Sequence, residues 1–405
     1  MATSGSGVVR PRSVLRLGAA VVIGGLLVGT AAYAADLGSD ERHRTGDSLA
    51  REWSARTGGQ QVLGGHWTPG VPSVQRLRHD GVTFTVTVAP ARPGPNLVRV
   101  DSTHAHGGGP PVLVGTDEDD LVRARPRPGT DGLWAVVDLP EGSGTVLVTH
   151  GPEHRLPFAV ETGTTPADTA TWTRGDGPEC LAAATAAVLA GGTVPARCPA
   201  DALGVPDASS LRGVVSTLAA RGVEEIAVDH DGSARSLAAY DLVRGLAAES
   251  GLRLVRPTDR PGARDALLVL GGWQSAATRL ARASGRPLHR QPIRSDGTWL
   301  APWLLTPGVV DSTAGAMLAL DFDIRDPRAQ QFSQVLGRYF PGQLPTGPAY
   351  AAWRAALDGE RSPLTLYAAS RAAYMPATGG HDHHETTVAW FPGGTVTPVG
   401  TPSPR

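Results

Sequence analysis

Histidines that stand close together are the residues of this sequence best suited to chemistry. The densest group comprises His381, His383 and His384, with two carboxylates among them. A second pair, His104 and His106, is separated by one residue, so both imidazoles point to the same side of an extended chain. Neutral imidazole is a ligand for borderline divalent cations, and copper or zinc are the metals that we expect at such clusters. The alternative is that both groups are solvated loops.

A second candidate site consists of polar and aromatic side chains that follow short apolar runs. The runs lie at 226–228, 266–270 and 299–301 and read as parallel strands, whose carboxyl ends meet at one edge of a sheet. The predicted ligand-binding residues after these runs are His230, Asp231, Ser233, Trp273, Gln274 and Trp303. The rings would stack on a small solute, and the polar groups would orient it. The alternative is that the tryptophans are core residues and that Asp231 and Ser233 are helix N-caps.

The two cysteines of the chain, Cys180 and Cys198, are expected to pair, because the N-terminal segment described below predicts export and an exported protein with two cysteines usually pairs them. A disulfide between them would close a loop of about 19 residues and stabilise the fold by roughly 3 kcal/mol. The alternative is a pair of buried free thiols.

Composition excludes several functions. The chain has 405 residues, with 37 basic and 38 acidic residues and a net charge of -1, so no basic field is present for nucleic-acid binding. Every basic residue is Arg. The absence of Lys excludes a P-loop, a pyridoxal Schiff base and a lysine nucleophile. No motif of an enzyme stands in a suitable context, and we expect a non-enzymatic protein.

The N-terminal segment predicts export or anchoring. Arg10, Arg12 and Arg16 precede an uncharged stretch over 17–35. This stretch is either a cleaved signal peptide or a retained membrane span, and in both cases the basic flank places the rest of the chain outside the cytoplasm. The predicted location is therefore the cell membrane, as a single-pass protein with an extracytoplasmic C-terminal region, or else the secreted fraction.

The remaining patterns predict a multidomain α+β chain. After the segment 1–35 we expect a polar stalk over 36–75 and a β-sandwich over 76–162, because short alternating strands are separated there by Pro and Gly clusters. Apolar periods of helices and strands then alternate over 172–376, which is typical of a parallel-sheet α/β domain. The last segment, 377–405, reads as a histidine-containing tail.

Two segments resemble known families. The run Val86–Val100, VTVAPARPGPNLVRV, resembles CopC/YtkA-like domains, which are immunoglobulin-like modules of bacterial copper-resistance proteins. The stretch Leu218–Val255, LAARGVEEIAVDHDGSARSLAAYDLVRGLAAESGLRLV, resembles the second lobe of type I periplasmic binding proteins, and 326–357 is similar to later helices of that family. The first likeness implies an immunoglobulin-like sandwich with a link to copper. The second implies a solute-binding α/β domain, truncated because only about 40 residues lie between the Thr-rich linker at 161–171 and Leu211.

Together these patterns favour an exported or membrane-anchored protein that binds or senses a small solute outside the cytoplasm. Copper or other divalent-metal handling through the histidines is the alternative. A third possibility is a scaffold for protein partners, including a membrane-protein partner.

Overall fold

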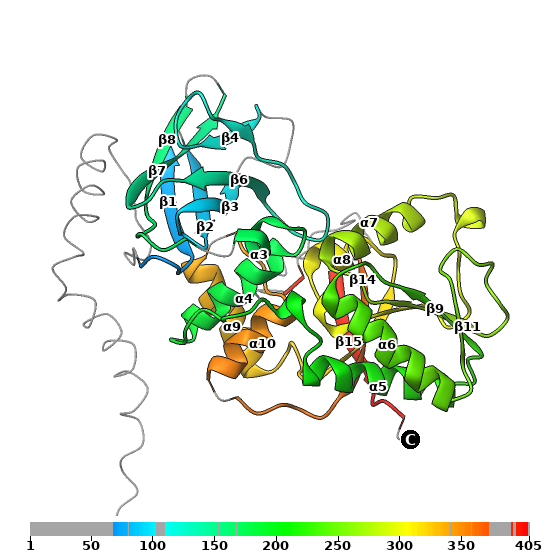
Figure 1. Ribbon diagram of the computed structural model, residues 1–405. Helices are drawn as coiled ribbons and strands as arrows, with labels where there is room; N and C mark the ends of the chain where they lie inside the picture. Colours follow the sequence, from blue (N-terminus) through cyan, green and yellow to red (C-terminus); the bar gives the residue numbers. More distant parts are fainter. Residues whose placement is uncertain are drawn as a thin grey trace, which may run out of the picture. The chain divides into compact units, whose positions relative to one another are not determined.

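The computed structural model describes residues 68–79, 81–102, 110–151, 154–166, 169–340, 342–357, 359–371, 390–391 and 394–403. All of them belong to one compact unit, Gly46–Arg405. The strands of this unit form two four-stranded antiparallel sheets and one seven-stranded mixed sheet (Figure 1).

The two four-stranded sheets share one apolar core and form a β-sandwich. The first sheet has the order β1 (Ser73–His79), β2 (Val82–Ala89), β3 (Gly94–Ser102) and β6 (Leu133–Leu139). The second has the order β5 (Val122–Arg123), β4 (Val112–Gly115), β7 (Ser143–His150) and β8 (His154–Glu161). Alternate residues of both sheets, such as Phe84 and Phe158, are buried between them. The two-sheet arrangement agrees with the predicted pattern, but β1 begins inside the segment expected to be a stalk.

A buried asparagine holds the proline-rich turn between β2 and β3. Asn96 is fully buried, and its Nδ2 donates hydrogen bonds of 2.7 Å to the carbonyl oxygens of Arg92 and Gly94. Its Oδ1 accepts from the backbone N–H of Arg92 at 3.3 Å. These bonds satisfy backbone groups that the turn leaves unpaired. The same bonds hold the turn in one conformation. The resemblance of the sandwich to CopC/YtkA-like domains stays a prediction.

The third sheet is mixed rather than parallel. Its order is β10 (Arg253–Val255), β9 (Glu225–Asp229), β11 (Asp265–Val269), β12 (Thr298–Leu300), β13 (Ala316–Leu320), β14 (Thr365–Arg371) and β15 (Gly394–Gly400). The first five strands are parallel, and the last two pairings are antiparallel. Residues 394–400, predicted to lie in a tail, are instead the edge strand. Alternation of Thr and Val suits them to the sheet, and the buried rings of Trp390 and Phe391 anchor the chain just before it.

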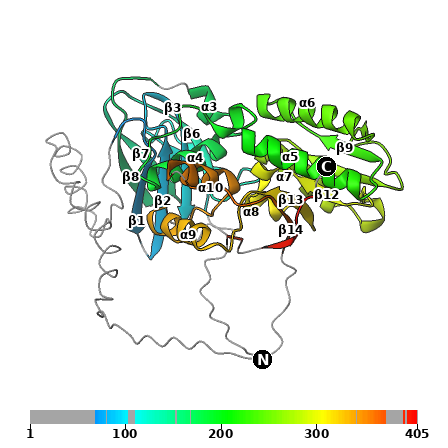
Figure 2. The same cartoon turned by 90° about the horizontal axis from the view of Figure 1, so that it is seen from below.

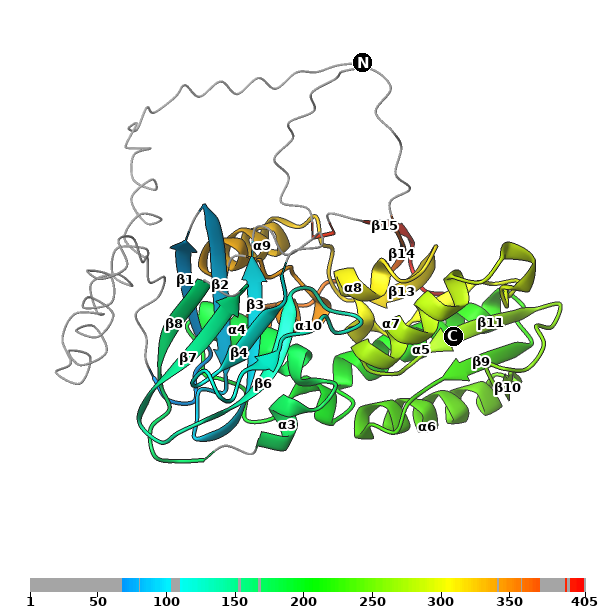
Figure 3. The same cartoon turned by 90° about the horizontal axis from the view of Figure 1, so that it is seen from above.

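Helices cover both faces of the third sheet. The helices of the described residues are α3 (Thr169–Thr173), α4 (Gly177–Leu189), α5 (Val205–Ala220), α6 (Ala234–Glu249), α7 (Trp273–Ser284), α8 (Pro307–Val310), α9 (Pro327–Tyr339) and α10 (Gly347–Ala356), with 3-10 turns η1 (Pro199–Asp201), η2 (Leu288–Arg290) and η3 (Pro302–Leu304). The pair α5 and α6 lies on one face, and α7 and α8 lie on the other (Figures 1 and 3). The helices α4, α9 and α10 pack together (Figure 2).

The two faces are covered because the chain leaves β9 and β11 in opposite directions. From β9, helix α6 leads to β10 on one side, whereas from β11, helix α7 leads to β12 on the other. Right-handed crossovers in opposite directions place their helices on opposite faces. The loops after β9 and β11 therefore meet at a topological switch point, where open α/β sheets usually bind ligands.

Among the described residues, no helix is both long enough and apolar enough to cross a membrane. The segment 17–35, which carries the membrane prediction, lies outside the described residues.

Candidate ligand-binding site

The switch point between β9 and β11 is occupied by a hydrogen-bond network centred on Asp231. This carboxylate accepts from the backbone N–H of Gly272 and the hydroxyl of Ser275, both at 2.7 Å, and from Ser233 Oγ at 2.6 Å. Burial opposes ionisation of Asp231, but the hydrogen bonds from Ser233, Gly272 and Ser275 outweigh it and lower its pKa to about 2. Asp231 thus joins the two loops as a permanent anion.

Two of the predicted binding residues fill the neighbouring space as buried rings. Trp273 and Trp303 are 3% and 2% exposed. The indole Nε1 of Trp273 donates to the carbonyl oxygen of Trp303 at 2.8 Å, and Nε1 of Trp303 donates to that of Gly271 at 3.0 Å. These bonds fix both rings and satisfy their polar atoms, as buried indoles require.

The other predicted residues lie in different surroundings. Ser233 is the N-cap of α6 and accepts from the N–H of Ser236. Gln274 is exposed on the first turn of α7. The ring of His230 lies tilted against that of Tyr240 with centroids 4.5 Å apart, and both line a shallow hollow of about 340 Å³ beside β10. The six residues therefore share one sheet edge without converging on one cavity, and their role in ligand binding stays a prediction.

A larger cavity, of about 430 Å³, lies beside the carboxyl ends of β12 and β13. Trp303 is the one predicted binding residue among the described residues that line it. Its walls come from η1, the start of α5, η3, the chain after β13, and α10. The apolar part of the lining comprises Pro206, Pro302, Trp303, Phe322, Pro348, Ala351, Ala352 and Ala355.

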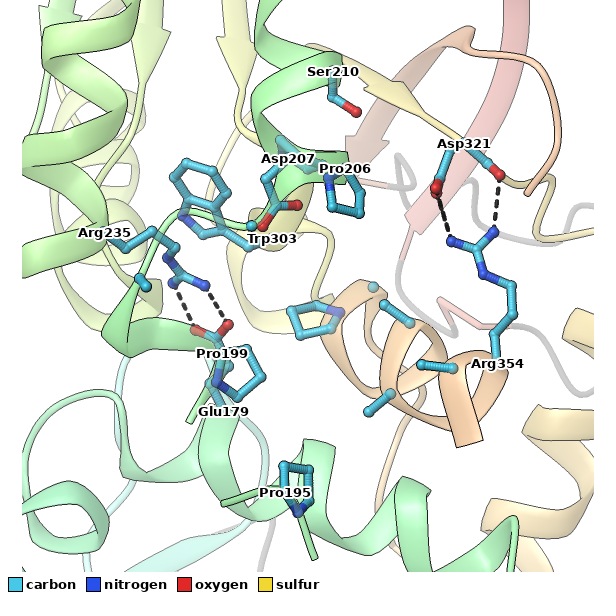
Figure 4. Close-up of a pocket in the computed structure, with 18 of the residues that line it drawn as sticks. Glu179, Pro195, Pro199, Pro206, Asp207, Ser210, Arg235, Trp303, Asp321 and Arg354 are labelled. Carbon is cyan, nitrogen blue, oxygen red and sulfur yellow. Dashed lines mark hydrogen bonds and ion pairs between the residues drawn. The ribbon is translucent and has the colours of Figure 1, made fainter. Parts of the chain in front are cut away.

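The first charged pair in the cavity joins two buried side chains. Arg235 Nη1 and Nη2 donate to the two carboxylate oxygens of Glu179 at 2.5 and 2.8 Å (Figure 4). The side chains are 2% and 0% exposed. The guanidinium carbon of Arg235 also lies 4.5 Å from the ring centroid of Trp303, a cation–π contact. Arg235 is thereby held rigidly at the wall of the cavity.

A second pair stands elsewhere on the wall. Arg354 of α10 donates from Nη2 to both carboxylate oxygens of Asp321, at 2.9 and 2.8 Å (Figure 4). Its Nη1 donates to the carbonyl oxygen of Asp321 at 2.9 Å, and Arg361 Nε lies 3.6 Å from the same carboxylate. Asp321 directly follows β13, so this pair fixes α10 to the edge of the sheet.

Asp207 and Ser210 are the polar lining residues contributed by α5. They stand three positions apart, which places them on one face of that helix. Burial raises the pKa of Asp207 to about 6, an effect that the positive charge of Arg235 only partly offsets. A carboxylate in this state is a marker of a functional site when it also lines a cavity.

Sequence reasoning did not identify Glu179, Asp207, Arg235, Asp321 or Arg354. One signal was available. Glu179 is the only charged residue in the sequence GPECLAAATAAVL of α4, and a lone charge in an apolar helix needs a buried partner. The partner, Arg235, lies 56 positions away, and nothing in the sequence pairs the two.

Cys180 and Cys198 form the predicted disulfide, so this prediction is confirmed. The bond joins α4 to the residue that precedes η1, and Cys198 lines the larger cavity. The disulfide thus holds one wall of the cavity in place.

The predicted metal ligands His104, His106, His381, His383 and His384 lie outside the described residues. Within the described part of the chain, no group of three or more His, Cys, Asp or Glu side chains is arranged to hold a metal ion. Copper and zinc binding therefore stays a prediction.

No protein-family model matches the chain, and no curated protein sequence is significantly similar to it. Partial structural similarity exists to substrate-binding proteins of ABC transporters. The leucine complex of such a protein from Desulfitobacterium hafniense shows 16% identity over 37% of this chain and 47% of its own, with a TM-score of 0.27.

Two further structures cover more of the chain. A leucine-, isoleucine-, valine-, threonine- and alanine-binding protein from Brucella ovis matches at 13% identity over 48% of this chain and 62% of its own, with a TM-score of 0.32. A branched-chain amino acid ABC transporter ligand-binding protein from Burkholderia xenovorans matches at 14% identity over 55% and 75%, with a TM-score of 0.30. The match spans less than half the length of the first of these proteins.

Proposed function

We propose that this protein binds a small solute in the cavity between α5, α10 and the carboxyl ends of β12 and β13. The observation that carries the proposal is a cavity of about 430 Å³ whose wall combines apolar surface with the ion pairs Arg235–Glu179 and Arg354–Asp321 and with two further carboxylates, those of Asp201 and Asp207. Small-molecule sites commonly have volumes of roughly 300–1,000 Å³ and this mixture of apolar walls and a few fixed polar groups.

Binding rather than catalysis is favoured by the way the charged groups are arranged. Glu179 accepts two hydrogen bonds from Arg235, and Asp321 accepts two from Arg354. Each of these charged groups is therefore already neutralised by its partner. Side chains that are fixed in such ion pairs form a preorganised wall, which can orient a ligand without a change in their own conformation.

The proposed location is outside the cytoplasm. The disulfide between Cys180 and Cys198 supports it, because such bonds persist in oxidising compartments and are rare in the cytosol. The proposal therefore describes capture or sensing of a solute outside the cell membrane.

The test is calorimetric titration of the purified full chain with a panel of small solutes, repeated with a variant whose cavity is filled. Ala351 lines the cavity from an exposed position on α10, so Ala351→Trp places an indole there without disturbing the core. The matched control is Ala248→Trp, at an exposed position of α6 that does not line the cavity.

We expect at least one solute to bind the wild type and the Ala248→Trp control equally, and to bind Ala351→Trp at least tenfold more weakly. Equal binding to Ala351→Trp would place the solute elsewhere and overturn the proposal. Thermal unfolding of all three proteins establishes that both variants are folded.

A further inference from the structure

The chain around the end of α7 carries a local excess of positive charge. From residue 266 to residue 295 it contains five arginines and one histidine but no acidic residue. Two of these arginines form ion pairs within the fold, Arg279 with Asp229 at 2.5 Å and Arg294 with Asp265 at 2.6 Å. The other three are Arg282, Arg286 and Arg290.

These three arginines are exposed and their charges are not neutralised by a neighbour. Arg282 lies in the last turn of α7, Arg286 follows the C-cap of that helix, and Arg290 is the last residue of η2. Among the residues that the structure describes, no carboxylate forms an ion pair with any of them. Ile293, on the same loop, is 63% exposed. Unpaired cations and an exposed apolar side chain therefore share one surface segment, 282–293.

A glutamine closes this loop and holds its ends together. The Nε2 atom of Gln291 donates to the carbonyl oxygens of Ser284 at 3.2 Å and Arg286 at 2.9 Å. The backbone N–H of Arg290 donates to the carbonyl oxygen of Pro287 at 2.7 Å. The loop is thus an ordered turn, and its three arginines and Ile293 are presented together.

Acidic residues beside the loop are engaged by other arginines. Asp296, which follows the loop, accepts a hydrogen bond of 2.6 Å from Nε of Arg221. Ser284, at the base of the loop, touches the chain that precedes β13, where the positive charge of Arg371 acts on Asp311. The positive charge of the loop is therefore not cancelled by these carboxylates.

The loop lies at the edge of the third sheet that is opposite to the cavity. Helix α7 begins after the carboxyl end of β11 and leads to the start of β12, which runs parallel to β11. The loop between α7 and β12 therefore stands at the amino ends of these strands, whereas the cavity of about 430 Å³ lies beside carboxyl ends. A partner bound to the loop would leave the cavity accessible.

We propose that the loop docks the protein on a membrane surface rich in anionic phospholipid. The guanidinium groups of Arg282, Arg286 and Arg290 donate to lipid phosphates, for which the planar fork of arginine is well suited. Ile293 enters the boundary between the headgroups and the acyl chains.

A membrane fits this surface better than a peptide does. The four side chains stand on an exposed loop, and none of them lines the two cavities described above. Peptides are commonly recognised in grooves or along strand edges, whereas a projecting loop with an exposed apolar side chain suits a flat bilayer. Each arginine at an anionic surface contributes about fivefold in affinity, so the three together contribute about a hundredfold.

The experiment observes the loop directly in the full chain. An environment-sensitive fluorophore is attached to the variant Ala281→Cys, because Ala281 is exposed on α7 beside Arg282, whereas Cys180 and Cys198 are buried in their disulfide. The emission is recorded with vesicles of phosphatidylglycerol and phosphatidylcholine in equal parts, and with vesicles of phosphatidylcholine alone. The label reports contact of the loop with lipid whether or not another segment also binds the vesicles.

Two triple variants of the labelled protein remove the same number of positive charges. The loop variant is Arg282→Gln/Arg286→Gln/Arg290→Gln. The matched control is Arg123→Gln/Arg125→Gln/Arg212→Gln, at exposed positions of the sandwich and of α5. Thermal unfolding establishes that both triple variants are folded.

We expect the emission of the labelled parent to shift to the blue with the anionic vesicles and to stay unchanged with phosphatidylcholine alone. The loop variant should need about ten- to hundredfold more anionic lipid for half of the shift, and the control variant the same amount as the parent. Ile293→Ser should need about threefold more or beyond. Salt at about 1 M should abolish the shift, because the Debye length falls to about 3 Å.

Three results would overturn the proposal. They are the absence of a shift with anionic vesicles, an equal shift with both kinds of vesicle, and a loss in the control variant as large as that in the loop variant. A shift with polyglutamate but none with anionic vesicles would assign the loop to an acidic protein partner and would overturn the proposal as well.

Discussion

The ion pair between Glu179 and Arg235 gives the sharpest prediction for stability. The substitution Glu179→Gln keeps the shape of the side chain but leaves the guanidinium of Arg235 without a counter-ion at 2% exposure. Removing one partner of a buried pair costs about 3–5 kcal/mol. Since Arg235 also borders the cavity, where water can enter, we expect the lower end, about 3 kcal/mol. For a folded unit of this size, the loss corresponds to a fall in melting temperature of roughly 4 °C.

The assay is urea and thermal unfolding followed by tryptophan fluorescence, with Asp241→Asn as the control. The pair Arg244–Asp241 is exposed, at 63% and 62%, so its loss should cost less than about 1 kcal/mol. The double variant Glu179→Gln/Arg235→Gln should be more stable than the two single effects added together. A cost for Glu179→Gln no larger than that of Asp241→Asn would refute the argument that the pair is buried and coupled.

Three further predictions concern other groups. Burial raises the pKa of Asp207 to about 6, so ionisation of this carboxyl destabilises the folded protein as the pH rises. The unfolding free energy of Asp207→Asn, measured in urea relative to wild type, should therefore rise by about 1–2 kcal/mol between pH 4 and pH 7. A difference that does not change with pH would contradict this prediction. Replacing Cys180 and Cys198 with Ala should cost about 3 kcal/mol, and thiol titration of the unfolded, unreduced wild type should find no free thiol. Replacing His381, His383 and His384 with Ala should weaken copper(II) binding. In the wild type, the copper affinity should fall as the pH drops through about 6.5. A copper affinity of the triple variant equal to that of the wild type would show that these histidines bind no metal.

The sequence predicted most elements of the fold because their patterns are local. Alternation of Val, Phe and Thr over 82–88 marks β2, and the apolar residues Leu211, Val214, Val215 and Leu218 mark α5. The final strand was missed because Gly394–Gly400 is short and rich in Thr and Gly, and its pairing with β14 is made by the backbone across a long gap in sequence. Antiparallel pairing of this kind leaves little trace in either strand alone.

The site was predicted only in part, and the reason is physical. The rule that ligands lie at the carboxyl ends of parallel strands pointed to the edge of the sheet that the cavity borders and to one residue of its lining, Trp303. It did not reveal that Asp231 fills the switch point with hydrogen bonds to Gly272 and Ser275. Nor did it reveal the cavity, whose charged wall brings together Glu179, Arg235 and Asp321 from three distant segments.

The most direct test of the central claim is a crystal structure of the protein bound to the tightest-binding solute of the panel. We expect the ligand within the cavity between α5, α10 and the carboxyl ends of β12 and β13, with its apolar part against Trp303. A ligand found instead in the hollow beside His230 and Tyr240, with the larger cavity empty, would contradict the account.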